Sequence, residues 1–232
     1  MTRPPGAAGA DGGHGTDGSV VDEVDPRPVR RHETLHRGRI MDLVRDDVDL
    51  GPAGVVTREY VDHPGAVAVV VLDDDDRVLL LRQYRHPVRS SLWEVPAGLL
   101  DVDGEPAVGA AARELAEEAD LTAEVWAVLA DYATTPGASN EAVRVFLARG
   151  LAEVPGDERH TRTGEEAGMV PVWVPLDEAV GLVLDGSLHN PSTVVGVLAA
   201  AASRTQGWAS LRPADAPWPH RRGALPDAPT GS

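Results

Sequence analysis

Four acidic side chains crowd the end of a predicted helix. The stretch AARELAEEAD holds Glu114, Glu117, Glu118 and Asp120 within seven positions, and Arg113 is its only basic residue. On a helix, Glu114 and Glu118 lie four residues apart, where like charges repel by about 0.2–0.5 kcal/mol per pair. The helix dipole also disfavours anions in the last turn. Clustered carboxylates suit Mg²⁺ or Mn²⁺, which prefer oxygen ligands, although a solvated acidic surface would carry the same residues.

The helix that carries these acids is expected near residues 106–119. Pro106 suits the first turn of a helix, where a backbone N–H has no partner in any case. A helical wheel predicts that one apolar arc faces the core and that the glutamates occupy the other side, with small alanines leaving space above them. The arc consists of Val108, Ala112, Leu115 and Ala119.

The segments around this helix read as strands and short helices. The run AVAVVVL is predicted to be a buried strand that pairs with RVLLLRQYR as a hairpin across the acidic turn DDDD. Further strands are expected at residues 92–100, 123–133, 141–150 and 169–176, and further helices at residues 177–185 and 191–204. Because strand and helix do not alternate regularly, the pattern favours an α+β, sandwich-like domain over a doubly wound parallel sheet.

Composition divides the chain into a body and two polar ends. Residues 1–33 are rich in Gly, Pro, Asp and Arg and are expected to form a disordered arm. Residues 206–232 are expected to form a loosely attached, Pro-rich tail. Between them, residues 34–61 favour a small antiparallel β unit, and residues 62–205 favour the main domain.

The charged and missing residue types exclude several classes of function. The formal net charge of −16 argues against nucleic acid and anionic membranes as partners, and an anionic substrate would need a divalent cation to screen it. The chain has no cysteine, which excludes disulfides and a cysteine nucleophile, and no lysine, which excludes Schiff-base chemistry. No apolar run reaches the roughly 18 residues of a membrane span, so a cytoplasmic location is expected.

The segment GLLDVDGEPAVGAAARELAEEADL, residues 98–121, resembles the Nudix box. That signature runs glycine, five residues, Glu, seven residues, Arg-Glu-aliphatic, one residue, Glu-Glu, one residue and Gly-aliphatic. The positions that match in register are Glu105, Arg113, Glu114, Leu115, Glu117, Glu118 and Leu121. Two positions depart from it, because six residues separate Gly98 from Glu105 and Asp120 replaces the closing glycine, where a left-handed helix cap is expected. The resemblance implies the α/β/α sandwich of that family, a mixed sheet with flanking helices.

Outside the box, the chain resembles the ADP-ribose pyrophosphatase branch of the Nudix family. The similar segments are REYVDHPGAVAVV, RQYRHPV and LWEVPAGLLD. In that branch a proline follows the closing glycine of the box by about sixteen residues, and Pro136 stands sixteen residues after Asp120. An ordinary Pro-Gly turn between strands is the alternative interpretation of Pro136.

The resemblance implies which residues hold the metal ions. The ligands would be the backbone carbonyl of Ala97 and the carboxylates of Glu114 and Glu118, while Glu117 binds a further ion or positions a water molecule. The residues implied to support this site are Gly98, Glu105 and Arg113. The last two would form an ion pair that anchors the loop to the helix.

The resemblance also implies a catalytic base and a set of substrate contacts. The base would be Glu166 or, alternatively, Glu165, in the acidic loop at residues 156–169. The implied substrate-binding residues are Arg58, Arg85, Glu94, Pro136, Ser139 and Glu141. Among them, Arg85 would contact the diphosphate, and the loop residues Ser139 and Glu141 would lie near the terminal ribose. Arg58 would cross to the partner subunit and contact the adenine of the substrate bound there.

The function implied is metal-dependent hydrolysis of ADP-ribose to AMP and ribose 5-phosphate, with Mg²⁺ or Mn²⁺ as cofactor. The branch also implies a homodimer formed through the N-terminal strands at residues 34–61. One alternative is the same chemistry on another nucleoside diphosphate derivative, such as a nucleotide sugar or NADH. A second alternative is a non-catalytic regulator that keeps the fold, although this chain retains all four glutamates of the box.

Overall fold

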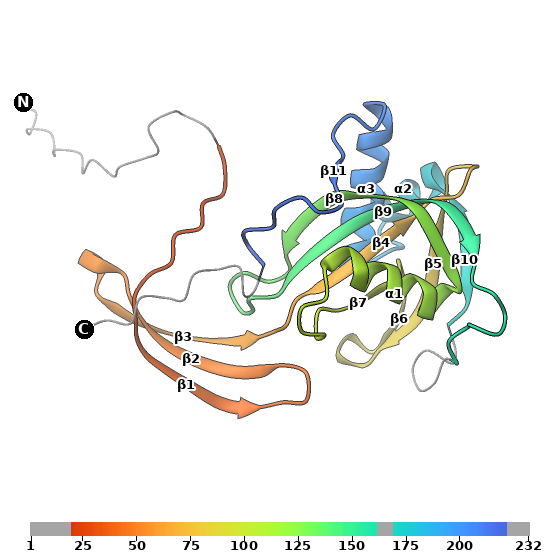
Figure 1. The fold of residues 1–232 in the computed structure, drawn as a ribbon. Helices are drawn as coiled ribbons and strands as arrows, with labels where there is room; N and C mark the ends of the chain where they lie inside the picture. The colour runs from red at the N-terminus through yellow and green to blue at the C-terminus, as the bar shows by residue number, and fades with distance from the viewer. Residues whose placement is uncertain (1–19, 162–168, 222–232) are drawn as a thin grey trace, which may run out of the picture.

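The computed structural model describes residues 20–161 and 169–221, which form three β-sheets with helices packed against them (Figure 1). The central sheet has the order β11-β8-β9-β4-β7, in which β4 and β9 are parallel and the other pairs antiparallel. Its strands are β4 (Ala66–Val71), β7 (Ala97–Leu99), β8 (Leu121–Ala133), β9 (Ala142–Glu153) and β11 (Arg212–Pro213). A second sheet has the order β10-β5-β6 and consists of β5 (Arg77–Arg85), β6 (Ser90–Glu94) and β10 (Pro171–Pro175).

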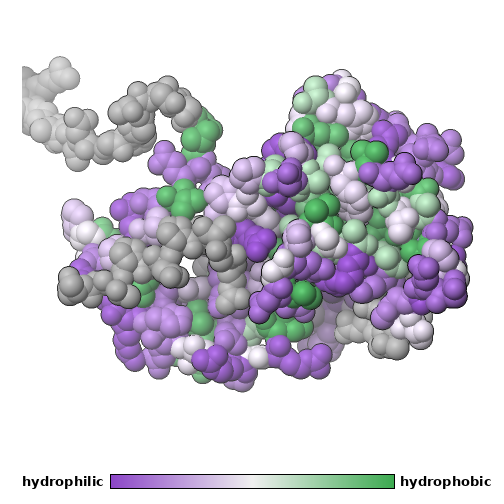
Figure 2. Space-filling view, in the orientation of Figure 1, coloured by the Kyte–Doolittle hydropathy of each residue, from purple (hydrophilic) through white to green (hydrophobic). Residues whose placement is uncertain are grey.

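A third, antiparallel sheet precedes the others and projects away from them (Figure 1). Its strands are β1 (Val29–Arg37), β2 (Asp42–Asp49) and β3 (Val55–Asp62). Ion pairs join neighbouring strands, as between Arg45 Nη2 and Glu59 Oε1 at 2.6 Å. Hydrophilic side chains cover most of the face of this sheet that Figure 2 shows. The small β unit expected at residues 34–61 is therefore present, and it is longer at its start because β1 begins at Val29.

The helices are α1 (Ala107–Ala119), α2 (Leu176–Leu184) and α3 (Pro191–Thr205), and short 3-10 turns occur at Gly51–Ala53 and His86–Val88. In the described ranges, none of these helices combines the length and the apolar character that crossing a membrane requires.

The core lies on both faces of the central sheet, and β4 shows why. Its alternate residues Val67, Val69 and Val71 pack with Leu115 of α1, whereas Ala68 and Val70 pack on the other face with the residues of α2 and α3. A strand covered on both faces reads as an unbroken apolar run, which is how AVAVVVL appears in the sequence. The result is the expected α+β fold, a mixed sheet sandwiched between helices.

The hairpin predicted between residues 66–72 and 77–85 is wrong as a pairing of two strands. The turn forms, and a single antiparallel bridge joins Leu72 to Val78, but β4 and β5 then separate into different sheets. β4 pairs with β7 and β9, and β5 pairs with β6 and β10. Since both edges of each strand are occupied by other partners, the two strands cannot also pair with each other.

The C-terminal end of the described chain is packed rather than loose. β11 adds to the edge of β8, and Trp218 is only 9% exposed. The buried guanidinium of Arg144 donates to the carbonyl oxygens of Ala216 (2.7 Å) and Pro217 (3.1 Å) and stacks over the Trp218 ring at 4.7 Å. The expectation of a loosely attached tail from residue 206 is therefore wrong for this segment, because a buried cation and an aromatic ring hold it.

Candidate active site

The last turn of α1 packs against β7, and this contact defines the candidate active site. Glu118 is 7% exposed, and its Oε2 accepts a hydrogen bond from the backbone N–H of Ala97 at 3.0 Å. The structure therefore brings the predicted ligands Glu118 and Ala97 together across 21 residues of sequence. We call this contact the α1–β7 junction.

Burial of Glu118 also corrects the helical wheel. The residues of α1 that are buried are Ala110, Ala111, Leu115 and Glu118. Of the arc predicted to face the core, Leu115 is buried, whereas Ala112 is exposed. The wheel assigned every glutamate to the outer face on charge alone, but the Ala97 N–H gives the Glu118 carboxylate a partner inside.

Gly98 provides the space in which the Glu114 carboxylate lies. A Cβ atom at Gly98 would lie 2.0 Å from both Cδ and Oε1 of Glu114, closer than any side chain permits. The glycine of the predicted box is therefore required by a close approach of side chain to backbone. This contact places Glu114 beside Glu118 at the α1–β7 junction.

Arg113 holds three of the surrounding carboxylates. Its guanidinium forms the expected ion pair with Glu105 through two hydrogen bonds, Nε to Oε1 at 3.2 Å and Nη2 to Oε2 at 3.1 Å. Its Nη1 contacts Glu114 at 2.7 Å and Glu117 at 3.5 Å. The hydrogen bonds to Glu105 first, and the charge of Glu114 with them, raise the pKa of Arg113 above its ordinary value. The cation therefore relieves the repulsion that the crowded acids would otherwise suffer.

The helix ends as the sequence predicts. Asp120 is the C-cap residue and adopts the left-handed conformation, with φ 55° and ψ 34°. Its N–H donates to the Ala116 carbonyl oxygen at 3.2 Å. Asp tolerates this conformation better than most residues, so the departure from the glycine of the box leaves the cap intact.

The donor atoms at the junction fit a hard divalent cation in chemistry, but the side chains are not arranged as a finished site. Glu118 offers a carboxylate at the Ala97 backbone, Glu114 offers one against Gly98, and Glu117 lies on the same helix and contacts Arg113. Over the residues that the structure describes, however, no group of three or more His, Asp or Glu side chains is positioned to hold a metal ion. Glu114 and Glu117 point to Arg113 instead, so binding a cation would require these side chains to turn.

A cleft of about 500 Å³ opens beside the junction, and we call it the first cleft. It brings together five residues predicted from the sequence, which are Arg85, Glu94, Ala97, Gly98 and Glu141. Between the two regions lies a gap too small to hold a water molecule, and Glu118 and Ala97 line it together with Arg85 and Glu94. Arg85 donates to Glu94 through Nε (2.9 Å) and Nη2 (2.6 Å), and this pairing fixes the plane of the guanidinium.

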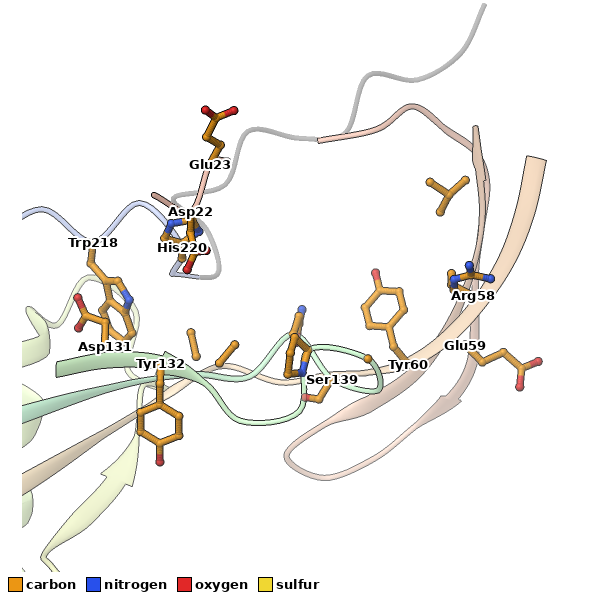
Figure 3. Close-up of a pocket in the computed structure, with 16 residues that line it drawn as sticks. Asp22, Glu23, Arg58, Glu59, Tyr60, Asp131, Tyr132, Ser139, Trp218 and His220 are labelled. Carbon is orange, nitrogen blue, oxygen red and sulfur yellow. The ribbon is translucent and has the colours of Figure 1, made fainter. Parts of the chain in front are cut away.

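The remaining predicted contacts line a different cavity of about 770 Å³, the second cavity (Figure 3). Arg58, Pro136 and Ser139 contribute to it, away from the α1–β7 junction. In Figure 3, Arg58 and Tyr60 extend from β3, and Trp218 and His220 come from the C-terminal segment. The structure thus divides the predicted substrate residues between two spaces.

The loop at residues 134–141 separates the first cleft from the second cavity. Thr134 and Glu141 line the first cleft, whereas Pro136 and Ser139 line the second cavity. Tyr132 precedes the loop and lines both spaces, and its hydroxyl lies 2.8 Å from Ser192 Oγ. Burial first, and the nearby Glu141 charge, raise the pKa of Tyr132, so this hydroxyl stays protonated near neutrality.

The sequence did not predict several residues that line these spaces. His63, Tyr132 and Ser192 line the first cleft, and Trp218 lines the second cavity. Trp218 could have been predicted to be buried, because a tryptophan in an otherwise polar C-terminal segment indicates a buried position. The candidate bases Glu165 and Glu166 lie outside the described residues, so their assignment stays a prediction from the sequence.

Comparison with known proteins agrees with this geometry. The NUDIX domain matches residues 62–193. An ADP-ribose pyrophosphatase of Mycobacterium tuberculosis is 50% identical over 186 residues, covering 80% of this chain and 88% of that protein. A methanol dehydrogenase activator of Bacillus methanolicus and an ADP-ribose pyrophosphatase of Bacillus subtilis are each 33% identical over 165 residues, covering 71% of this chain and 87% of each protein.

A solved structure described as an ADP compounds hydrolase shares the fold. It superimposes with a TM-score of 0.65 at 23% sequence identity. The superposition covers 81% of this chain and 99% of that chain. The likeness therefore extends beyond the matched domain to most of the described elements.

Proposed function

The chain belongs to the Nudix family, and on that premise we propose that it hydrolyses the diphosphate bond of ADP-ribose, giving AMP and ribose 5-phosphate. The relatives that carry this activity in their names support the choice of substrate. The reaction consumes one water molecule, whose oxygen ends on a phosphate, and the other phosphate leaves with the bridging oxygen.

The observation that carries the proposal is the proximity of Arg85 to the α1–β7 junction. Glu118 and Ala97 line the same gap as the Arg85 guanidinium, and Gly98 lines the first cleft. Carboxylates that suit a divalent cation thus stand beside a fixed cation that suits phosphate oxygens. A diphosphate is the group whose hydrolysis needs both.

We assign the metal ligands to the Ala97 carbonyl, Glu114 and Glu118, with Glu117 assisting. A divalent cation held there, Mg²⁺ or Mn²⁺, supplies charge compensation for the diphosphate and activation of water. Arg113 and Glu105 position the helix relative to the preceding loop. This role follows from their ion pair, since neither residue lines the first cleft.

The remaining steps fall to residues of the cleft and the acidic loop. Arg85 donates hydrogen bonds to phosphate oxygens, with Glu94 holding its orientation. Attack at phosphorus depends on such alignment and charge stabilisation rather than on covalent chemistry by the protein. Glu166, or alternatively Glu165, accepts the proton of the attacking water as general base.

We also propose that the two spaces bind different parts of the substrate. Glu141 in the first cleft suits hydroxyl groups of the terminal ribose, because an ionised carboxylate only accepts hydrogen bonds. Pro136 and Arg58 contribute from the second cavity to the nucleoside end, Arg58 being offered to a partner subunit. Ser139 lines the second cavity and not the first cleft, so this division assigns the terminal ribose to Glu141 alone.

A homodimer through the N-terminal sheet completes the proposal. This sheet projects from the domain (Figure 1), and large apolar side chains are exposed on it or beside it, including Leu43, Val55, Ile40 and Met41. Such residues on an extended sheet favour contact with a second copy. Sedimentation analysis of the full chain should give twice the monomer mass, and a concentration-independent monomer would contradict the dimer.

A substrate panel tests the proposed specificity. The purified chain with Mg²⁺ should hydrolyse ADP-ribose with a higher kcat/KM than NADH, GDP-mannose or deoxynucleoside triphosphates. A higher kcat/KM for another nucleoside diphosphate derivative would support the proposed reaction and contradict the choice of ADP-ribose as substrate. Absence of hydrolysis across the whole panel would favour the non-catalytic alternative.

A further inference from the structure

His63 is a buried titratable residue that the proposed chemistry does not use. It lies between β3 and β4, is 7% exposed, and lines the first cleft with Arg85 and Glu141. Its backbone is fixed separately from its side chain. The His63 N–H donates to Asn140 Oδ1 at 2.8 Å, and Asn140 Nδ2 donates to Asp62 Oδ1 at 2.6 Å.

The hydrogen bonds of the ring determine its tautomer. His63 Nδ1 accepts from the backbone N–H of Gly65 at 3.1 Å, so Nδ1 carries no proton and the neutral ring is protonated at Nε2. Gly65 has φ 91°, in the region that favours glycine. The Nε2–H side of the ring faces Glu141, with Nε2 3.7 Å from Oε1.

The Glu141 carboxylate is held from two directions. Its Oε2 accepts from Thr134 Oγ1 at 2.8 Å, and its Oε1 faces His63 Nε2. The Nε2 separation is longer than a hydrogen bond and within the range of an electrostatic contact. The carboxylate is therefore hydrogen-bonded through Oε2, faces the His63 ring through Oε1, and belongs to a residue that lines the first cleft.

We propose that His63 is a positioning residue, whose Nε2–H orients the Glu141 carboxylate to accept hydrogen bonds from sugar hydroxyl groups in the first cleft. This inference rests on the proposed function for the identity of the sugar. It assigns to the ring two separable tasks. Nδ1 holds the turn at Gly65, which concerns the fold, and Nε2 holds Glu141, which concerns substrate binding.

Two substitutions separate these tasks by side-chain length. An Asn amide ends at the position of Nδ1, so His63→Asn keeps an acceptor for Gly65 and loses the donor toward Glu141. A Gln amide reaches the position of Nε2, so His63→Gln keeps the donor and loses the acceptor for Gly65. We expect His63→Asn to raise the KM for ADP-ribose about three- to tenfold with kcat within about twofold and an unchanged Tm. His63→Gln should lower the Tm and keep a KM close to that of the unchanged chain.

A purely structural role gives the opposite order. If His63→Gln raised the KM and His63→Asn left it unchanged, the ring would serve the Gly65 turn alone and the proposal would be wrong. The Glu141→Gln background provides a further check. There His63→Asn should have little additional effect on KM, because the two residues act through one contact.

A second measurement is independent of activity. In ¹⁵N-histidine NMR spectra of the full chain, His63 should be the Nε2–H tautomer, and Glu141→Gln should shift its Nε2 signal more than its Nδ1 signal. A proton on Nδ1, or an Nε2 signal insensitive to Glu141→Gln, would overturn the inference. If the unchanged chain does not hydrolyse ADP-ribose, the proposed function fails, and these spectra still decide whether His63 holds Glu141.

Discussion

The Glu118 side chain lies between α1 and β7, with one carboxylate oxygen accepting from the Ala97 N–H at 3.0 Å. A glutamine at this position keeps the length of the side chain and an oxygen that can accept the same hydrogen bond. It removes the negative charge, which is what a divalent cation requires. The Glu118→Gln substitution therefore tests the negative charge of this side chain while leaving its packing unchanged.

Glu118→Gln should lower the kcat/KM of Mg²⁺-dependent ADP-ribose hydrolysis at least about 100-fold, because losing a direct ligand exceeds the 10–100-fold cost of losing an outer partner. The Tm should change by only a few degrees. Activity within about threefold of the unchanged chain would contradict the assignment of Glu118 as a ligand. Glu124→Gln is the matched control, since it makes the same change of charge at an exposed position, and its activity should be unaltered.

Gly98→Ala tests the close approach of Glu114 to the backbone. The added methyl group would stand 2.0 Å from the carboxylate, so the Glu114 side chain must move. We expect the free energy of unfolding to fall by about 1–3 kcal/mol and hydrolysis to fall with it. Gly181→Ala is the control, because nothing lies within 4 Å of its Cβ position in α2 and alanine favours the helix. Full activity of Gly98→Ala would show that the position of Glu114 is not needed.

At the level of elements, the C-terminal segment at residues 211–218 belongs to the domain. Arg144, buried on β9, pairs with Asp131 through Nε at 2.7 Å and Nη2 at 2.9 Å, and it also donates to two carbonyl oxygens of the segment. Arg212 donates to the same Asp131 carboxylate at 2.8 Å. The segment in turn supplies Trp218 to the wall of the second cavity.

Trp218→Ala should release this segment. We expect the free energy of unfolding to fall by about 3 kcal/mol, as for other buried aromatic residues, measured by urea denaturation. Limited proteolysis should cut the segment after residue 210 faster than in the unchanged chain. Val125→Ala, at a half-exposed position of β8, should change the stability by less than about 0.5 kcal/mol. An equally small effect of Trp218→Ala would mean that the ring adds nothing to the attachment.

The elements differ in how far the sequence alone predicts them. Apolar runs and alternation predict where β4, β5, β8 and β9 lie, because those patterns follow from burial of one or both faces of a strand. They do not say which strands pair, so the hairpin that they predict between β4 and β5 is wrong. Pairing depends on contacts between segments distant in the sequence, such as β4 with β9.

The candidate site divides in the same way. The register of the acids, the Glu105–Arg113 ion pair and the left-handed Asp120 are local features, and each is present as predicted. The burial of Glu118 and the role inferred for His63 depend on partners from other elements, Ala97 and Glu141. A helical wheel contains no information about such partners, so it assigns Glu118 to the outer face.

At the scale of the whole molecule, charge and shape constrain the reaction together. The formal net charge of −16 repels an anionic substrate at long range. Arg85 in the first cleft and Arg113 at the α1–β7 junction concentrate positive charge where the diphosphate is expected. Both guanidinium groups, however, are already paired with glutamates, so little of their positive charge is available to the substrate. We therefore expect a divalent cation to offset the substrate charge at the site.

The most direct test is the dependence of ADP-ribose hydrolysis on a divalent cation. The full chain is freed of metal with a chelator, and AMP and ribose 5-phosphate are then separated and measured with and without added Mg²⁺ or Mn²⁺. We predict that both products form in equal amounts only when the cation is present, and that Glu118→Gln does not respond to it. Equal hydrolysis in the presence of the chelator, or cation-dependent hydrolysis that Glu118→Gln retains, would contradict the account.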